Sequence, residues 1–207
     1  MKKRGLMLWS LMLAGSMLIM SGCQSEYDKM RRRELASGVR QDSLFFGIYM
    51  GMPSEDFFAR CLSLNRQHIL TNNSDGRRVQ CFIKGEDPQI IMNFYPNFKE
   101  NQIREMPVDF HYASWSPWNK HLWADKLLPK MVSIFERWYG KGFIKMEDEK
   151  RGVIYVKIDG NRQIVIGAKD DQFVKANFTD LTNPIEAEEI ENVPARPQPK
   201  TTSQNAR

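Results

Sequence analysis

The sequence lacks the motifs that mark catalysis or a bound metal. It has no His-Glu-x-x-His pair, no Gly-x-Ser-x-Gly turn, no Ser-x-x-Lys motif and no glycine-rich phosphate loop. None of its three histidines, His68, His111 and His121, stands four residues from another. Asp109 and His111 share one side of a predicted strand, where an exposed strand end explains them better than a metal site. We therefore expect no enzyme, no catalytic residue, no cofactor and no metal.

Cysteine is scarce. The chain has three cysteines, Cys23, Cys61 and Cys81, and no Cys-x-x-Cys motif, which argues against structural zinc and thiol-redox chemistry. In an exported protein Cys61 and Cys81 could form one disulfide, but both could equally be small buried side chains. The disulfide is supported only by strand alternation, which would place Cys81 beneath a predicted helix that carries Cys61.

A strong excess of one charge is also missing. The formal net charge is +5, but residues 1–22 hold three cations and no acid, so the remaining chain carries +2. The cations of that remainder are scattered and do not form a stripe. We therefore expect no nucleic-acid partner.

An apolar run over residues 6–20 is too short for a permanent membrane span. It has fifteen residues, whereas a spanning helix needs about 20. The cations Lys2, Lys3 and Arg4 precede the run and small residues follow it, which is typical of a cleaved signal peptide.

The residues Met20-Ser21-Gly22-Cys23 resemble the lipobox of bacterial lipoproteins, in which an apolar and two small residues precede a cysteine. The resemblance implies a signal peptide over 1–22, cleavage before Cys23, and acyl chains such as palmitate on Cys23 that bind the membrane. Gln24 follows the cysteine in place of an aspartate, which implies a lipid anchor in the outer membrane, facing the periplasm or the surface. The alternative is an uncleaved N-terminal helix with a chance cysteine.

Composition divides the rest of the chain into three parts. Residues 23–42 are polar and charged and predict a lipidated, disordered tether, whose basic cluster at 29–33 is either solvated or rests on anionic headgroups. Residues 43–182 predict one globular domain. Residues 183–207 are rich in proline and polar residues and predict a disordered tail.

The domain is predicted to be α+β, with two helices packed on an antiparallel sheet and a possible division into two helix-plus-three-strand halves. Apolar spacing predicts helices over 53–68 and 119–139, with Pro129 on the solvent side of the second. Buried runs and alternation predict strands over 44–50, 79–83, 90–95, 103–111, 153–158, 163–168 and 173–178.

Aromatic residues gather between residues 112 and 123. Tyr112, Trp115, Trp118 and His121 could form a platform for a sugar ring or a partner peptide, because such side chains are apolar with a polar end. The alternative is that the tryptophans close the core where strand meets helix.

The run over 47–58 resembles the strand-glycine-methionine-helix opening of small lipoproteins that assist outer-membrane protein assembly. That resemblance implies a lipobox, a tether and a small non-catalytic α+β domain. We expect an envelope lipoprotein that binds another envelope component, a protein or a glycan, in an accessory or assembly role. The alternative function is a carbohydrate- or cell-wall-binding module that uses Tyr112–Trp123.

Overall fold

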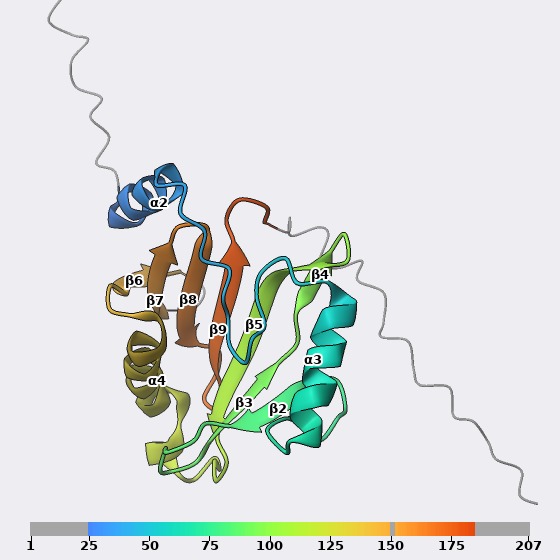
Figure 1. Ribbon diagram of the computed structural model, residues 1–207. Helices are drawn as coiled ribbons and strands as arrows, with labels where there is room; N and C mark the ends of the chain where they lie inside the picture. The colour runs from blue at the N-terminus through green and yellow to red at the C-terminus, as the bar shows by residue number, and fades with distance from the viewer. Residues whose placement is uncertain (1–24, 150–151, 185–207) are drawn as a thin grey trace, which may run out of the picture.

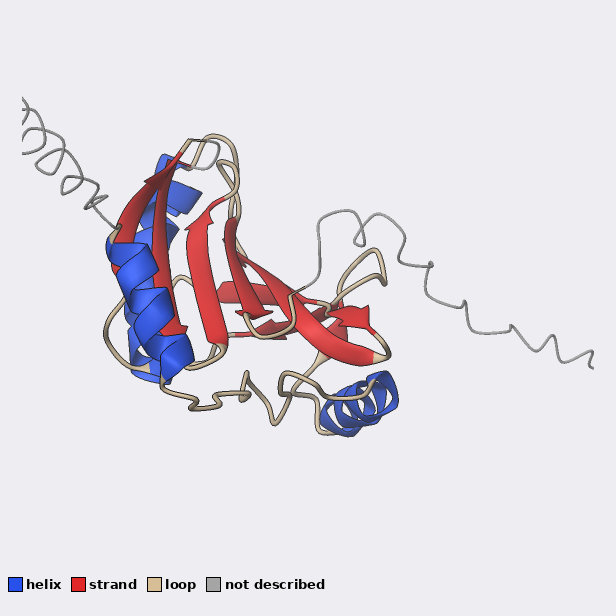
Figure 2. Ribbon diagram, turned by 90° about the horizontal axis from the view of Figure 1, so that it is seen from above, coloured by secondary structure: helices blue, strands red, loops and turns tan. Residues whose placement is uncertain are grey.

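The computed structural model describes residues 25–149 and 152–184, which form one α+β unit built on a single antiparallel sheet. The sheet has nine strands in the order β1-β2-β3-β5-β9-β8-β7-β6, and β4 pairs with β5 beside this path. Figures 1 and 2 show how strongly the strands twist from one edge to the other. The predicted α+β class is confirmed.

The strands cover Thr71–Asn72 (β1), Val79–Phe82 (β2), Ile90–Phe94 (β3), Asn97–Lys99 (β4), Gln102–Tyr112 (β5), Ile144–Asp148 (β6), Gly152–Asp159 (β7), Arg162–Ala168 (β8) and Val174–Asp180 (β9). At the centre of the sheet, β5 pairs with β9 and brings Met106 opposite Phe178. The sequence predicts three strands after each helix, but α3 is followed by five, β1 to β5, and α4 by four. The additional strand after α4 is the charged segment around Glu147, which pairs with β7 as the edge strand β6.

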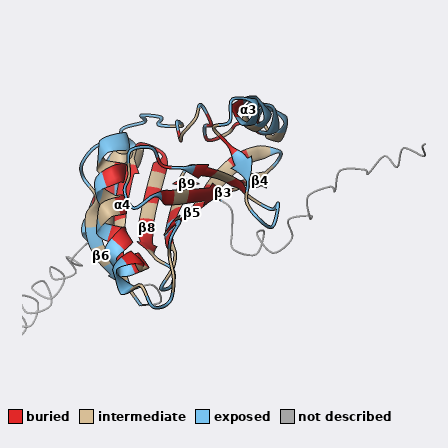
Figure 3. Ribbon diagram, turned by 90° about the horizontal axis from the view of Figure 1, so that it is seen from below, coloured by how far each residue is buried: buried red, intermediate tan, exposed pale blue. Residues whose placement is uncertain are grey.

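Helices α3 (Ser54–Arg66) and α4 (Ala124–Tyr139) cover one face of the sheet (Figure 1). A buried stripe runs along α4, whereas α3 buries only Phe57 and Leu64 (Figure 3). Pro129 lies inside α4 on its exposed side, as predicted. The helix begins later than predicted, because Trp123 is extended and separates it from the short 3₁₀ helix η1 (Lys120–Leu122).

A third helix, α2 (Glu26–Ala36), covers the opposite face. Ile164 and Ile166 of β8 belong to the main core with α4, whereas Val165 between them packs in a second cluster with Met30 of α2. Successive strand residues point to opposite faces, so α2 and α4 lie on opposite sides of the sheet. The second cluster also contains Ile154, Val156 and Ile158 of β7.

The prediction of two helices is therefore wrong, because α2 is a third one. The prediction of a disordered tether over 23–42 is also wrong for the residues of that range that the structure describes. Ser25 caps α2 by accepting a hydrogen bond from the backbone N–H of Asp28 at 3.1 Å, and Tyr27 donates to Gln163 Oε1 at 2.7 Å. These contacts and the burial of Met30 give the polar segment a fixed place on the sheet.

The predicted strand over 44–50 is a tight turn instead. Leu44 N–H donates to Ile48 O and Ile48 N–H donates to Phe45 O, both at 2.9 Å. Phe46 and Gly47 both have positive φ, which reverses the chain between the isolated bridge partners Ser43 and Tyr49. The apolar side chains of this run are packed as expected, but on a turn and not on a strand.

Candidate functional site

A groove of about 740 Å³ opens on the sheet face that carries α3 and α4. The turn at 44–46, the end of α3, the β2–β3 hairpin and the C-terminal end of α4 surround it. Its lining residues are Leu44, Phe45, Phe46, Gln67, His68, Ile69, Cys81, Phe82, Ile83, Lys84, Glu86, Met92, Arg137, Trp138 and Tyr139. Most of them are apolar or aromatic, as in a binding site for an apolar ligand.

Hydrogen bonds to both helices fix the wall formed by residues 44–46. Tyr139 Oη of α4 donates to Leu44 O at 3.0 Å, and Arg60 Nε of α3 donates to Phe46 O at 2.6 Å. Phe45 packs edge-on against Phe94 and Phe178 of the sheet, with ring centroids 4.9 and 5.9 Å apart. The wall is thus tied to the helices and the core, and the groove is preformed.

The rim carries more positive than negative charge. Glu86 pairs with Lys130 at 3.0 Å and with Arg137 at 2.7 Å. The hydrogen bond from Lys130, followed by its charge and by Arg137, lowers the pKa of the Glu86 carboxyl. Lys84 is exposed beside this group. The polar edge of the groove therefore suits a ligand that carries a carboxylate.

Two large apolar side chains of the groove are exposed. Phe82 is 50 % exposed, and Trp138 is also partly open to solvent. The sequence analysis did not predict Phe82 as a binding residue. The sequence does contain a signal for its exposure. Phe82 alternates with the buried positions Val79, Cys81 and Ile83, so strand alternation places this large apolar side chain outside the core.

No disulfide joins Cys61 and Cys81 in the described part of the chain. Cys81 is a buried thiol on β2, and burial raises its pKa to about 12. Val79, Cys81 and Ile83 do share the core face, as strand alternation predicts.

We expect iodoacetamide at pH 8 to leave Cys81 unlabelled in the folded chain and to label it after unfolding, because the thiolate is the reactive form. Cys61 is only partly buried, so the extent of its labelling in the folded chain is the internal comparison for Cys81. Peptide mass spectrometry under non-reducing conditions measures both sites. A disulfide-linked Cys61–Cys81 peptide would contradict the expectation.

The aromatic residues predicted as a ligand platform do not gather into one surface. Tyr112 is buried, and Trp115 packs against the main core. Trp118 is 87 % exposed and His121 is exposed as well. The alternative, in which the tryptophans close the core, is confirmed for Trp115 and is wrong for Trp118.

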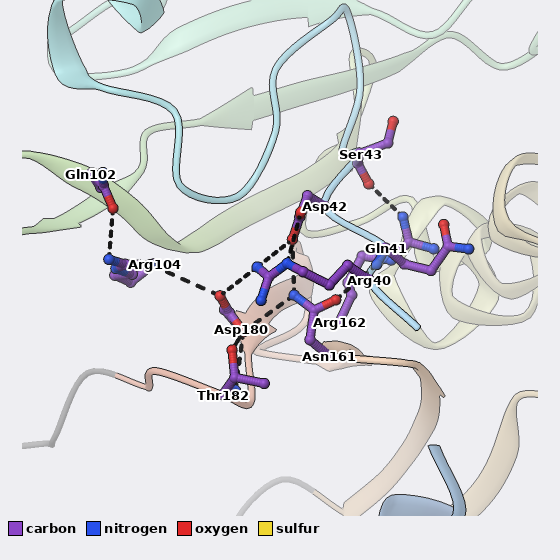
Figure 4. A network of polar contacts seen from close by, with 10 residues as sticks. All are labelled: Arg40, Gln41, Asp42, Ser43, Gln102, Arg104, Asn161, Arg162, Asp180 and Thr182. Carbon is purple, nitrogen blue, oxygen red and sulfur yellow. Dashed lines mark hydrogen bonds and ion pairs between the residues drawn. The ribbon is translucent and has the colours of Figure 1, made fainter. Parts of the chain in front are cut away.

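A polar network, here called the clasp and formed by Arg40, Asp42, Asn161 and Asp180, ties the N-terminal segment to the sheet (Figure 4). Buried Asn161 donates to Asp42 Oδ1 at 2.9 Å and to Asp180 Oδ1 at 3.2 Å, and its own Oδ1 accepts from Gln41 N–H at 2.8 Å. Arg40 contacts Asp42 Oδ1 at 2.8 Å and Asp180 Oδ2 at 3.5 Å.

Asp180 is ionised within this network. Burial opposes its charge, but hydrogen bonds from Thr182 and Asn161 and the charge of Arg40 outweigh burial and lower its pKa. Both the hydroxyl (2.6 Å) and the backbone N–H (3.0 Å) of Thr182 donate to Asp180 Oδ1. The clasp is a structural junction in which the Asn161 amide and the Asp180 carboxylate are bonded to other groups of the protein.

Beside the clasp, Arg162 is buried and joins three elements. Its guanidinium donates to Ser43 O, lies 5.0 Å from the ring centroid of Tyr139, and pairs with Asp159 Oδ2 at 3.0 Å. Asp159 also pairs with buried Lys157. One carboxylate thus serves two buried cations at the β7–β8 turn.

The predicted cleavage and lipidation site lies outside the described residues, as do the predicted signal peptide and nearly all of the predicted tail. Within the part that the structure describes, no group of three or more His, Cys, Asp or Glu side chains is arranged to hold a metal ion. Over the same residues, every helix is too short or too polar to cross a bilayer.

Comparisons of this chain with protein-family models, with curated proteins and with solved structures gave no match.

Proposed function

We propose that this chain is a lipid-anchored protein of the bacterial outer membrane whose α+β domain binds another envelope component through the groove. Its role is accessory or in assembly, without catalysis of its own. The lipobox resemblance at Cys23 supports the anchor. The groove supports the binding role.

The binding role rests on three properties of the groove together: its volume, its apolar lining and the exposure of large apolar side chains in it. The volume of about 740 Å³ falls within the range of roughly 300–1,000 Å³ typical of ligand sites. Exposed apolar side chains that adjoin one another mark interaction sites more often than isolated ones do. Phe82 and Trp138 both line this groove, together with buried Met92.

The occupant we propose is a segment of another envelope protein, with apolar side chains and a neighbouring carboxylate. Its side chains would cover the aromatic lining, and its carboxylate would face Lys84 and Arg137 at the rim. The lining cations Lys84 and Arg137 outnumber the lining acid Glu86, so a negative charge on the partner is favourable.

We also propose that the domain consists of two halves, α3 with its following strands and α4 with its own. The antiparallel pairing of β5 and β9, the last strand of each half, supports this division. The groove would then lie where the two halves meet, since its lining comes from the ends of both helices.

Phe82→Ser is expected to reduce capture of the partner at least about tenfold in crosslinked envelopes, because aromatic anchors in apolar pockets carry most of an interface's binding energy. Leu62→Ser on α3 is the matched control: Leu62 is 52 % exposed, close to the 50 % of Phe82, and does not line the groove. Quantitative mass spectrometry of the captured proteins, with full-length protein in its own membrane, measures the difference.

Equal capture by the two variants would contradict the role of the groove, and so would a partner set no different from that of an unrelated lipoprotein. Denaturant unfolding of both variants confirms that neither substitution acts through stability. An intact mass without acyl chains on Cys23 would contradict the anchor separately.

A further inference from the structure

The outer surface of α2 is basic. Lys29, Arg31, Arg32 and Arg33 are all exposed, whereas Met30 faces the sheet. Among the acids of the helix, Glu34 is partly buried: its Oε2 accepts a hydrogen bond from Gly160 N–H at 3.2 Å, and its Oε1 pairs with Arg33 at 3.0 Å. The positive charge of the segment therefore lies on the side that faces away from the protein.

Two further acids do not cancel this surface. Asp28 accepts a hydrogen bond from the Ser25 hydroxyl at 2.7 Å within the N-terminal cap, and Glu26 also stands in the first turn. Acids at this end complement the helix dipole. In the following turn Arg33 pairs with Glu34 at 3.0 Å, whereas Arg31 and Arg32 are exposed to solvent.

The chain between the proposed anchor and α2 is very short. Cys23 precedes Glu26, the first residue of the helix, by three positions. Three extended residues span at most about 11 Å, which is close to the Debye length of about 8 Å at physiological ionic strength. If Cys23 holds acyl chains, the start of α2 lies within about 11 Å of them, so the cations that follow can reach the lipid headgroups.

We propose that the basic surface of α2 (Lys29, Arg31, Arg32 and Arg33) lies on an anionic lipid surface and orients the domain on the membrane. This inference rests on the proposed anchoring at Cys23. Each cation near such a surface strengthens the attraction about fivefold. The occupant is a phospholipid bilayer with negative headgroups, because the basic charge and the short connection to the acyl chains both favour it.

The helix can orient the domain because it is attached to the sheet rather than to a flexible linker. Met30 is buried among β7 residues, Tyr27 bonds Gln163 of β8, and Glu34 bonds Gly160 of the turn between these strands. Trp118 and Lys126 belong to the segment around the start of α4, away from α2 (Figure 1). When α2 rests on the bilayer, that segment faces away from it.

The test uses the acylated full chain reconstituted into vesicles and labelled with an amine-reactive reagent. Vesicles of phosphatidylcholine alone are compared with vesicles that also contain phosphatidylglycerol. We expect the labelling rate of Lys29 to fall at least about fivefold with the anionic lipid, while Lys126, an exposed lysine on α4, keeps its rate. Salt at about 1 M, where the Debye length is about 3 Å, should restore labelling of Lys29.

The double variant Arg31→Gln/Arg32→Gln should abolish the protection, and Arg66→Gln/Arg77→Gln, two exposed cations far along the chain from α2, should not. Equal labelling of Lys29 in both vesicle types, or protection of Lys126 instead, would overturn the inference. A chain that does not float with either vesicle and shows no acyl mass would overturn the proposed anchor as well. Flotation without protection of Lys29 would overturn the orientation alone.

Discussion

Asp159→Asn is expected to lower the free energy of unfolding by about 3 to 5 kcal/mol, because it leaves buried cations without their counter-charge. Arg162 and Lys157 pair with the Asp159 carboxylate, and their side chains are only 6 % and 9 % exposed. A neutral amide occupies the same space but cannot balance either charge. Urea unfolding at pH 7, followed by circular dichroism, measures the loss.

Asp125→Asn is the control for this substitution. Asp125 pairs with Lys126 on the surface, and exposed pairs contribute about 0 to 1 kcal/mol. The double variant Asp159→Asn/Lys157→Met should recover part of the loss, because it removes one of the unpaired cations. Unfolding midpoints that agree between Asp159→Asn and Asp125→Asn would show that the buried pairs contribute nothing.

Gly160→Ala is expected to cost about 3 kcal/mol or more and to release the N-terminal segment from the sheet. A Cβ on residue 160 would lie 2.0 Å from the carbonyl oxygen of Val39, a backbone atom held in place by the neighbouring clasp. The residue also has φ +55°, where an L side chain adds about 1–2 kcal/mol of its own. Urea unfolding measures the stability, and hydrogen exchange of residues 26–42 measures the release.

Gly152→Ala is the control that separates the steric clash with Val39 from the cost of an alanine at positive φ. Gly152 has φ +67°, and a Cβ there meets nothing within 4 Å. Both variants therefore carry the same strain, and only Gly160→Ala must displace the chain at Val39. If the two variants unfold alike and exchange in residues 26–42 does not change, the close approach is not a structural constraint.

The strongly periodic parts of the fold could be predicted from sequence. The apolar stripe of α4 includes Leu127, Met131 and Ile134 at helical spacing, and all three are buried. The strands predicted over 153–158 and 163–168 are β7 and β8, which pair as an antiparallel hairpin. In these elements, local spacing and tertiary burial require the same conformation.

Helix α2 could not be predicted, because its stability does not reside in its own sequence. It buries one apolar residue, Met30, and its other contacts reach β8 across a separation of 136 residues, as between Tyr27 and Gln163. The opposite error occurred at 44–50, where an apolar run indicates burial but not conformation. Leu44, Ile48 and Met50 are buried there on a turn.

The groove was missed for a related reason. Its lining comes from the segment after α3, from α4, from the β2–β3 hairpin and from the 44–46 turn, so no single stretch of sequence contains it. The aromatic segment at 112–123 was predicted as a ligand platform because its residues are close together in sequence. Tyr112 and Trp115 point into the core, and Trp118 into solvent, which adjacency alone does not reveal.

The position of β9 also governs when the domain can be completed. β9 is the last strand, yet it lies in the middle of the sheet between β5 and β8, and its final residue, Asp180, joins the clasp with Arg40 and Asp42. A chain that emerges from a ribosome or a translocon N-terminus first must therefore wait for residues 174–180 before its two sheet halves join. Until then the central edges of β5 and β8 are open, so each molecule passes through a stage in which a chaperone, or another unfinished copy, competes with its own last strand.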